Sequence, residues 1–586
     1  MNIMVLAVNQ LKSPDYIVLA GYFALMLGIG IYFYRHMKGM KDYFSGGNSI
    51  PWWLSSVSFY MSSFSAFAFV GHAALAYRYG LVALTLLWTS IPATLISVIF
   101  FSRNWRRARI DSPVEYLELR YSPVVRQMFA WEGIPVRIID DALKLVAIGI
   151  FVSKGLGLDM GLCMLGSGVI ILGYTLMGGL WAVAVTDFVQ FVVLAVAIVV
   201  LIPLSISQAG GINNAFSNFP DGFLHLTHPP KYDIVYIMGC LLVMTLAYSS
   251  INWSLIQRYY CVPKEKDALK VGWFVIILFI FGHAMVTIPP ILAQKFIDTQ
   301  GDDRQVYILL CLKLLPAGMV GLLIAAMFAA TMSMLSSDFN ICAGVLTNDV
   351  YRRLIRPQAS QKELILAGRI LTLLVGGITL SVAFLMIKWS GEKLFRGMVT
   401  LFSTFTPPVA VPMILGLFSR KMNNKGTLAG FLAGVGLGLT LFFLLRDQEN
   451  IGGIILKKET ILVLATTLIT TVVMVTVSLK FPASLSESQR AECFLRRLNI
   501  PIGQLAEDKL TSVESGTSLI SPFRVVGISI LLIGVLMLVI LPFVTRSMAF
   551  WLDLSIGLGL VLLGGLVIIR GRNSNPYQQP TEAESE

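Results

Sequence analysis

The chain has 586 residues, of which 56% are hydrophobic and 13% charged, and its formal net charge is +12. A mean hydropathy of +0.75 excludes an ordinary soluble globular protein, because so few polar side chains cannot cover a surface that faces water. We expect an all-α polytopic membrane protein embedded in a lipid bilayer. The positive charge lies mainly in short loops between apolar segments, so we interpret it as a topological signal and not as a nucleic-acid-binding surface.

Fifteen segments are apolar enough to cross the hydrocarbon layer as helices of about 20 residues. They are expected at 15–35, 52–76, 81–102, 124–153, 160–177, 182–205, 233–256, 271–294, 316–346, 365–388, 397–418, 427–445, 459–478, 523–545 and 550–570.

The basic loops predict the orientation of these segments. If the segments alternate in direction, the basic loops fall on one side, which is then the cytoplasmic side of the cell (inner or plasma) membrane. The N-terminus is therefore expected outside and the C-terminus inside. The basic residues concerned are Arg35, Lys38, Lys41, Arg103, Arg106, Arg107, Arg109, Arg258, Lys264, Lys266, Arg352, Arg353, Arg356, Arg420, Lys421, Lys425, Arg570 and Arg572.

Hydroxyl and amide side chains interrupt the second and the seventh expected segments. The second contains Ser55, Ser56, Ser58, Ser62, Ser63 and Ser65, and the seventh contains Thr245, Ser249, Ser250, Asn252 and Ser254. The two segments lie five helices apart and so cross in opposite directions. Interrupted helices at corresponding places of two inverted halves are typical of a transporter binding site at the midplane. Close packing through small residues is the structural alternative.

The fourth expected segment begins with four charged residues on one helix face, Arg137, Asp140, Asp141 and Lys144. Their spacing allows the ion pairs Arg137–Asp141 and Asp140–Lys144. Charges at membrane depth are costly unless they are paired or face a wet cavity, so the face is either functional or a self-neutralised structural element. If it is functional, the carboxylates could accept hydrogen bonds from substrate hydroxyls, or the basic groups could bind a substrate carboxylate.

Two further groups of polar residues lie inside apolar segments. Asp187 is the only acidic residue of the sixth segment, and this isolation favours a cation ligand or a counter-charge over a residue that only stabilises the helix start. In the ninth segment a ladder of polar groups shares one helix face. The ladder could bind a neighbouring helix, allow close packing, or replace the water around a cation. It consists of Ser333, Ser336, Ser337 and Asn340.

Four motifs occur in order along the chain: DYFSGGNSIPWW, GGLWAVAVTDFVQ, INWSLIQRYYCV, and AATMSMLSSDFN followed by TNDVY. Together they resemble the sodium:solute symporter family, which includes sodium–sugar, proline and monocarboxylate cotransporters, over residues of roughly 40 to 420. The resemblance implies a leucine-transporter-type fold of two inverted five-helix repeats, with Na⁺ as the coupling ion. It divides the chain into an extra N-terminal helix and loop (1–48), a first repeat (49–206), a second repeat (207–420), and extra C-terminal helices with a cytoplasmic loop at 479–522 and a short polar tail (421–586).

The resemblance also implies two sodium sites. The motif positions of the first are the backbone carbonyls of Met61, Phe64 and Ala330 and the hydroxyl of Ser333. Met334 stands where many members have a second hydroxyl residue, so this site has lost an oxygen ligand. The matching positions of an additional site are Asp187, Ser333, Ser336 and Ser337. Transport of one or of two sodium ions is compatible with the sequence.

The solute is expected to be a sugar or a sugar-like compound, with an organic acid or monocarboxylate as the alternative. Phe67, Ala68 and Phe69 stand where sugar-transporting relatives have long polar side chains, and the stretch from Tyr77 to Gly80 resembles the iodide and monocarboxylate branch. Asp140 and Asp141, in contrast, suit a polyhydroxy ligand better. The candidate solute-binding residues are Ser63, Phe67, Asp140, Asp141, Lys144 and Asn252.

Other classes fit the sequence less well. The five histidines, His36, His72, His225, His228 and His283, have no convincing metal-ligand or acid–base spacing, so neither an enzyme nor a transition-metal site is expected. A sensor or a channel that keeps the transporter fold is the remaining alternative; a channel would conduct without solute. The oligomeric state is left open by the sequence.

Overall fold

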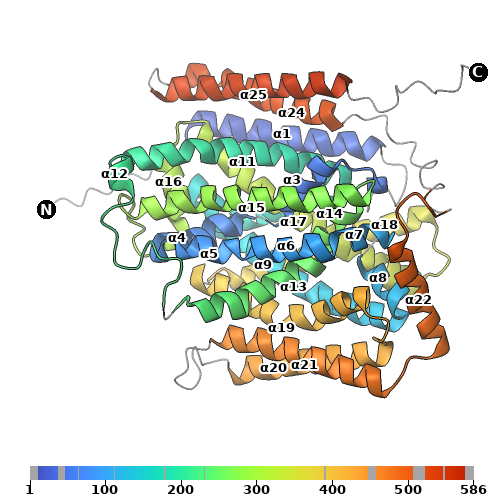
Figure 1. The fold of residues 1–586 in the computed structure, drawn as a ribbon. Helices are drawn as coiled ribbons and strands as arrows, with labels where there is room; N and C mark the ends of the chain where they lie inside the picture. The colour runs from blue at the N-terminus through green and yellow to red at the C-terminus, as the bar shows by residue number, and fades with distance from the viewer. Residues whose placement is uncertain are drawn as a thin grey trace, which may run out of the picture.

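The computed structural model describes residues 11–36, 46–63, 65–110, 113–176, 180–229, 231–388, 391–445, 457–505, 508, 522–544 and 548–573. Almost all of these residues lie in helices (Figure 1), and the only isolated β-bridge among them joins His228 and Tyr232. Helices are the expected solution in a bilayer, because they satisfy every backbone polar group within the segment.

The first part of the bundle begins with the N-terminal helix α1 and ends with α11. Its elements are α1 (Ser13–His36), α3 (Trp52–Ser62), the π-helical η2 (Ala68–His72), α4 (Ala73–Tyr79), α5 (Val82–Trp88), α6 (Ser90–Phe100), α7 (Ser102–Arg107), α8 (Pro113–Arg120), α9 (Pro123–Leu156), α10 (Met160–Thr175) and α11 (Leu180–Gln208).

The second part follows a loop that contains the short helix α12 (Ile212–Ala215). It comprises η3 (Tyr236–Leu242), α13 (Val243–Ile251), α14 (Trp253–Tyr260), α15 (Glu265–Ala293), η4 (Asp303–Gln305), α16 (Val306–Leu314), α17 (Met319–Val345), η5 (Leu346–Ile355), α18 (Gln361–Met386) and α19 (Gly391–Phe418). The C-terminal helices are α20 (Asn424–Leu444), α21 (Lys458–Lys480), α22 (Leu485–Asn499), α24 (Pro522–Val539) and α25 (Met548–Asn573).

Each of the fifteen expected segments coincides with a helix or with a series of helices broken within the segment. Eleven described helices are by themselves long and apolar enough to span a membrane. Two bent pairs pass the same test together: α9 with α10, at an angle of 117°, and the η3–α13 helix with α14, at 50°. The second expected segment does not pass, because its break divides it into the short helices α3 and α4.

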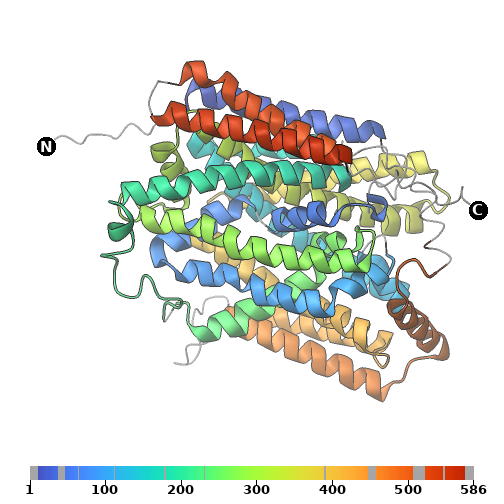
Figure 2. The same cartoon turned by 45° about the horizontal axis from the view of Figure 1, so that its top comes forward.

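Helix α17 forms the centre of the bundle. The apolar window of its span is 100% buried, and it packs against α1, α9, α11 and α18. Figures 1 and 2 show α24 and α25 beside α1 on one flank, and α20 and α21 beside α19 on the opposite flank. Residues on α17 are therefore shielded from lipid on all sides.

The N-terminus of α17 is fixed by a carboxylate from α1. Asp15 Oδ1 accepts hydrogen bonds from the backbone N–H groups of Gly318 (2.6 Å) and Gly321 (2.9 Å). These donors lack partners within the helix, and the helix dipole favours a negative charge at this end. Glycine is required at 321, because a Cβ there would lie 2.3 Å from the Asp15 carbonyl oxygen. The extra N-terminal helix is thus anchored to the central helix.

Arg258 does not lie in a loop, which corrects the expectation that placed it among the basic loop residues. It is part of α14, and its side chain is 1% exposed. A buried guanidinium must be paired, so its partners define a polar centre inside the bundle.

Candidate sodium and solute sites

The break in the second expected segment lies where α3 meets α17. Helix α3 ends at Ser62, and the next helical turn begins only after Ser65. The backbone N–H of Ala66 donates to Thr331 Oγ1 on α17 (2.9 Å), so the central helix satisfies part of the broken backbone. The predicted interruption of this segment is confirmed.

The residues expected at the first sodium site lie on both sides of this junction. Met61 is in the last turn of α3, and Ala330 and Ser333 are on α17; all three are buried. Phe64 lies outside the described residues. Met334, at the position of the missing oxygen, lines the cavity of about 170 Å³ that is described below.

The seventh expected segment is broken at Asn252. Its backbone is extended (φ −58°, ψ 127°), and its side-chain oxygen accepts hydrogen bonds from the N–H groups of Ser254 (3.0 Å) and Leu255 (3.2 Å). Asn252 therefore caps α14, and this capping explains the sharp bend. The second predicted interruption is also confirmed.

Asp187 and Ser333 present unsatisfied oxygen atoms to the middle of the bundle. Ser58 Oγ donates to Asp187 Oδ2 (2.5 Å), whereas Asp187 Oδ1 and Ser333 Oγ lie near each other without a hydrogen bond of ordinary geometry among the described residues. Both side chains are at most 1% exposed. A buried polar atom without a partner is costly, and carboxylate and hydroxyl oxygens suit a hard cation. This pair therefore fits a sodium ion.

Arg258 occupies the other side of Asp187. Its Nη2 lies 3.9 Å from Asp187 Oδ2 and donates to Ser62 Oγ (3.0 Å) and Ser337 Oγ (3.3 Å). Its Nε donates to Ser58 Oγ (3.0 Å). One guanidinium thus connects α14 with α3, α11 and α17.

The four residues expected at the additional sodium site are therefore not equivalent. Asp187 and Ser333 have free oxygens, Ser336 Oγ donates to the Ser333 carbonyl (3.1 Å), and Ser337 accepts from Arg258. The sequence reasoning missed Arg258, although a charged residue within INWSLIQRYYCV was a usable signal.

A cavity of about 170 Å³ lies beside the break in α3. Four of the six expected solute-binding residues line it, namely Ser63, Phe67, Asp140 and Lys144. Its other polar lining residues are Ser65, His72, Thr245, Tyr248 and His283. A second cavity of about 50 Å³ is lined by Asp140 and Asn252 among others. Tyr248 and Phe402 line both cavities and contact each other edge to face (5.1 Å), so they separate the two.

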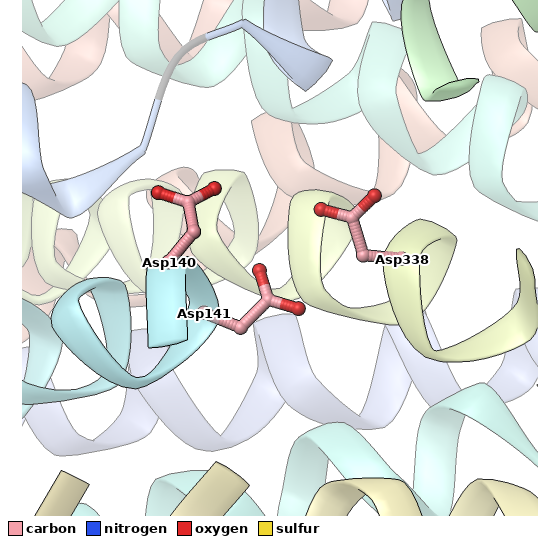
Figure 3. Close-up of side chains that lie close together, drawn as sticks. All are labelled: Asp140, Asp141 and Asp338. Carbon is pink, nitrogen blue, oxygen red and sulfur yellow. The ribbon is translucent and has the colours of Figure 1, made fainter. Parts of the chain in front are cut away.

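Asp141 lines neither cavity and instead belongs to a buried charged cluster. Asp140 and Asp141 from α9 and Asp338 from α17 bring their carboxylates together (Figure 3), with one oxygen of each within 4.8 Å of the others. Lys144 Nζ lies 2.7 Å from Asp140 Oδ2 and 2.9 Å from Asp141 Oδ1. The predicted Asp140–Lys144 pair is confirmed.

The predicted Arg137–Asp141 pair is wrong. Arg137 Nε lies 3.5 Å from Asp338 Oδ1, and its guanidinium stacks on Trp253 (3.9 Å). The spacing along α9 could not reveal this partner, because Asp338 comes from another helix. An acid inside the apolar ninth segment was nevertheless as strong a signal as Asp187.

Comparisons with known proteins agree with this architecture. A family model described as the sodium:solute symporter family matches residues 43–434. The chain is 27% identical over 475 residues to human sodium/myo-inositol cotransporter 2, covering 73% of this chain and 70% of that protein. It is 26% identical over 473 residues to the sodium/glucose cotransporter of Vibrio parahaemolyticus, covering 74% and 86%.

The fold is similar to the solved outward-open, substrate-bound structure of a Na⁺-coupled sialic acid symporter. The TM-score is 0.70 at 20% identity, with 80% of this chain and 98% of that chain covered. This similarity confirms the expected leucine-transporter-type fold. The chain therefore belongs to the sodium:solute symporter family, as a multi-pass membrane protein that couples the movement of a solute to Na⁺.

Proposed function

We propose that this symporter imports a small hydroxylated, sugar-like solute together with sodium by alternating access. The names of its relatives support this solute class, because they include a myo-inositol and a glucose cotransporter. The cavity supports it through size and chemistry: a small space with apolar walls and a few hydroxyl, imidazole and carboxylate groups. We assign the chain no catalytic reaction.

The sodium ion is proposed to bind between Asp187 and Ser333, with Ser336 and Ser337 nearby. The observation that carries this proposal is the pair of buried, unpartnered oxygens, Asp187 Oδ1 and Ser333 Oγ. The carbonyls of Met61, Phe64 and Ala330 are proposed to form the neighbouring site with Ser333. A site shared by α3, α11 and α17 couples the ion to the relative position of these helices, because only one arrangement supplies all the oxygens.

We further propose that residues 49–206 and 207–420 are the two inverted repeats, flanked by 1–48 and 421–586. The basic loops favour a cytoplasmic position for the α22 end of the bundle, which lies at the right in Figure 1. The N-terminus would then be outside and the C-terminus inside.

Sodium entry can supply enough free energy for concentrative uptake. A membrane potential of about 100 mV contributes roughly 2.3 kcal/mol per ion. A tenfold sodium gradient adds about 1.4 kcal/mol. With tight coupling, one ion could therefore sustain about a 500-fold accumulation of a neutral solute.

The test is uptake of labelled myo-inositol and glucose into liposomes that contain the purified protein. We expect accumulation above equilibrium with external sodium and none with choline. Ser333→Ala, which removes a proposed ligand, should raise the half-saturating sodium concentration. Ser381→Ala on the exposed face of α18 is the matched control and should not. Equal accumulation in choline would contradict the proposed coupling.

A further inference from the structure

The buried charged cluster beside the larger cavity contains more acidic than basic groups. Asp140, Asp141 and Asp338 form the buried carboxylate cluster, and Glu132 lines the smaller cavity beside it. Two basic residues face these four acids: Arg137 and Lys144. With Glu132 neutral and the three clustered carboxylates and two basic groups ionised, one negative charge remains to attract a cation.

Neither basic group offers an unpaired charge to a solute in the larger cavity. Lys144 Nζ lies 2.7 Å from Asp140 and 2.9 Å from Asp141, and Asp338 Oδ2 adds a longer ion pair at 3.6 Å. Arg137 lies 3.5 Å from Asp338, stacks on the ring of Trp253, and lines only the smaller cavity. An anionic solute in the larger cavity would therefore meet the Asp140 carboxylate without a free counter-ion.

Asp140, in contrast, has an oxygen available for a ligand. Its ion pair with Lys144 uses Oδ2, and the structure gives Oδ1 no partner among the described residues. Asp140 also lines both cavities.

A second, independent group points into the same cavity. His283 on α15 is 4% exposed, lines the cavity, and has a buried Nδ1 with no partner among the described residues. Its ring is fixed by stacking on Phe279 (4.8 Å, 21°). A buried imidazole nitrogen without a partner indicates a polar ligand, because leaving it unpaired is costly.

We propose that the solute carries a protonated amino group in addition to hydroxyl groups, as an amino sugar or a hydroxylated amine does. Asp140 Oδ1 is the counter-ion of the amino group, and His283 Nδ1 hydrogen-bonds to a hydroxyl. This inference rests on the proposed sugar-like class and narrows it. It also disfavours the organic-acid alternative.

The experiment compares three compounds built on one six-carbon ring, namely glucose, glucosamine and glucuronate, at slightly acidic pH, where the amine is protonated. Each compound is added as a competitor, and the sodium-dependent uptake of labelled myo-inositol into liposomes that contain the full chain is measured. We expect glucosamine to compete at a concentration roughly tenfold lower than glucose, as one charge-assisted hydrogen bond predicts, and glucuronate not to compete. Glucosamine transport should also move one more elementary charge per solute than glucose transport.

The outcomes separate the two proposals. Equal or stronger competition by glucose or glucuronate overturns the amino-group inference and leaves the sugar-like class standing. If none of the three compounds competes for uptake in sodium, and none stabilises the protein thermally, the sugar-like class itself is overturned.

The variant Asp140→Asn assigns the effect to one residue. It leaves Lys144 paired with Asp141 and should remove the preference for glucosamine over glucose in the competition assay, whatever its effect on the rate of glucose transport. Asp221→Asn, which changes an exposed loop carboxylate, is the matched control and should keep the preference. A tenfold preference that survives in Asp140→Asn contradicts the role of Asp140. Thermal unfolding of the variant, measured with and without glucosamine, distinguishes lost recognition of the amino group from a variant that does not fold.

Discussion

The guanidinium of Arg258 lies 3.9 Å from the carboxylate of Asp187, and the two side chains are 1% and 0% exposed. Each is the principal counter-charge of the other, because burial without a partner would be prohibitive. Asp187 nevertheless keeps one oxygen unpartnered, on the side of Ser333. We interpret the carboxylate as shared between a fixed cation, Arg258, and a mobile one, sodium.

The substitution Asp187→Asn should lower sodium-dependent uptake by at least about tenfold, because it removes the charged ligand and with it more than about 1.4 kcal/mol of sodium binding. The amide still accepts a hydrogen bond from Ser58, so the protein should remain in the membrane. Uptake measured against sodium concentration, with surface expression as the control, checks this result. Unchanged sodium activation would count against the site.

The substitution Arg258→Gln should make the stability of the protein depend more strongly on sodium. Without its counter-charge, buried Asp187 is destabilised by about 3–5 kcal/mol, and a bound sodium ion can offset that loss. We expect the melting temperature in choline to fall and sodium to restore more of it than in the parent protein. Arg353→Gln, which removes a guanidinium that is 38% exposed from its ion pair with Glu118, is the control. An equal sodium response in both variants would show that Arg258 and sodium do not share Asp187.

The sequence was sufficient to predict the helices and the two interruptions, because hydropathy and hydroxyl clusters are local properties. It also identified Asp187, which stands alone in an apolar segment. The burial of Arg258 could not be predicted in the same way. Arg258 lies near the end of its segment, where a basic residue normally marks a loop, and its partner Asp187 is far away in the chain. Arg137 shows the same limit, because its true partner Asp338 belongs to a different helix.

The substitution Met334→Ser should lower the half-saturating sodium concentration. It restores a hydroxyl at the position where many family members have one, next to Ser333 on α17. A thioether is a poor ligand for a hard cation, whereas one added oxygen contributes on the order of 1 kcal/mol, or about fivefold in affinity. Met334→Ala, which removes the thioether without adding an oxygen, separates the two effects. If both variants had the half-saturating sodium concentration of the parent, the methionine at position 334 would have no effect on sodium binding.

The substitution Asp15→Asn should destabilise the protein by about 1–2 kcal/mol, because it weakens a charged cap at the start of α17. The amide oxygen can still accept from Gly318 and Gly321, but the amide NH2 replaces Oδ2, which accepts from the Lys12 N–H, and the negative charge at the helix dipole is lost. Thermal unfolding in detergent measures this loss. Tyr16→Phe, at an exposed neighbouring position, is the control. An unchanged melting temperature would show that α1 does not stabilise the central helix.

The C-terminal end of helix α22 should loosen from the bundle at acidic pH, because an ion pair outside the membrane helps to hold it. Arg109 Nε and Nη2 bind Asp508 (2.7 and 2.9 Å), and the same guanidinium donates to the carbonyls of Arg497, at the end of α22, and Pro501. The hydrogen bonds from Arg109 are the main reason why the pKa of Asp508 is lowered from 3.8 to about 2. A lowered pKa stabilises the folded form above pH 3.8, and this contribution disappears as the pH falls through about 2.

A fluorophore on Cys493 can report the position of α22, because this cysteine is exposed whereas the other five are buried. We expect its signal to change in the parent protein only below about pH 4, and in Asp508→Asn already at neutral pH, since the amide cannot pair with Arg109 as a carboxylate does. Glu265, which contacts Arg107 and the Ile502 N–H, is present in both proteins. The difference between the two proteins therefore isolates Asp508. The control is Glu492→Gln, at an exposed position on α22, which should give the same signal as the parent. If Asp508→Asn also gave the parent's signal at neutral pH, the ion pair would be excluded as a restraint on α22.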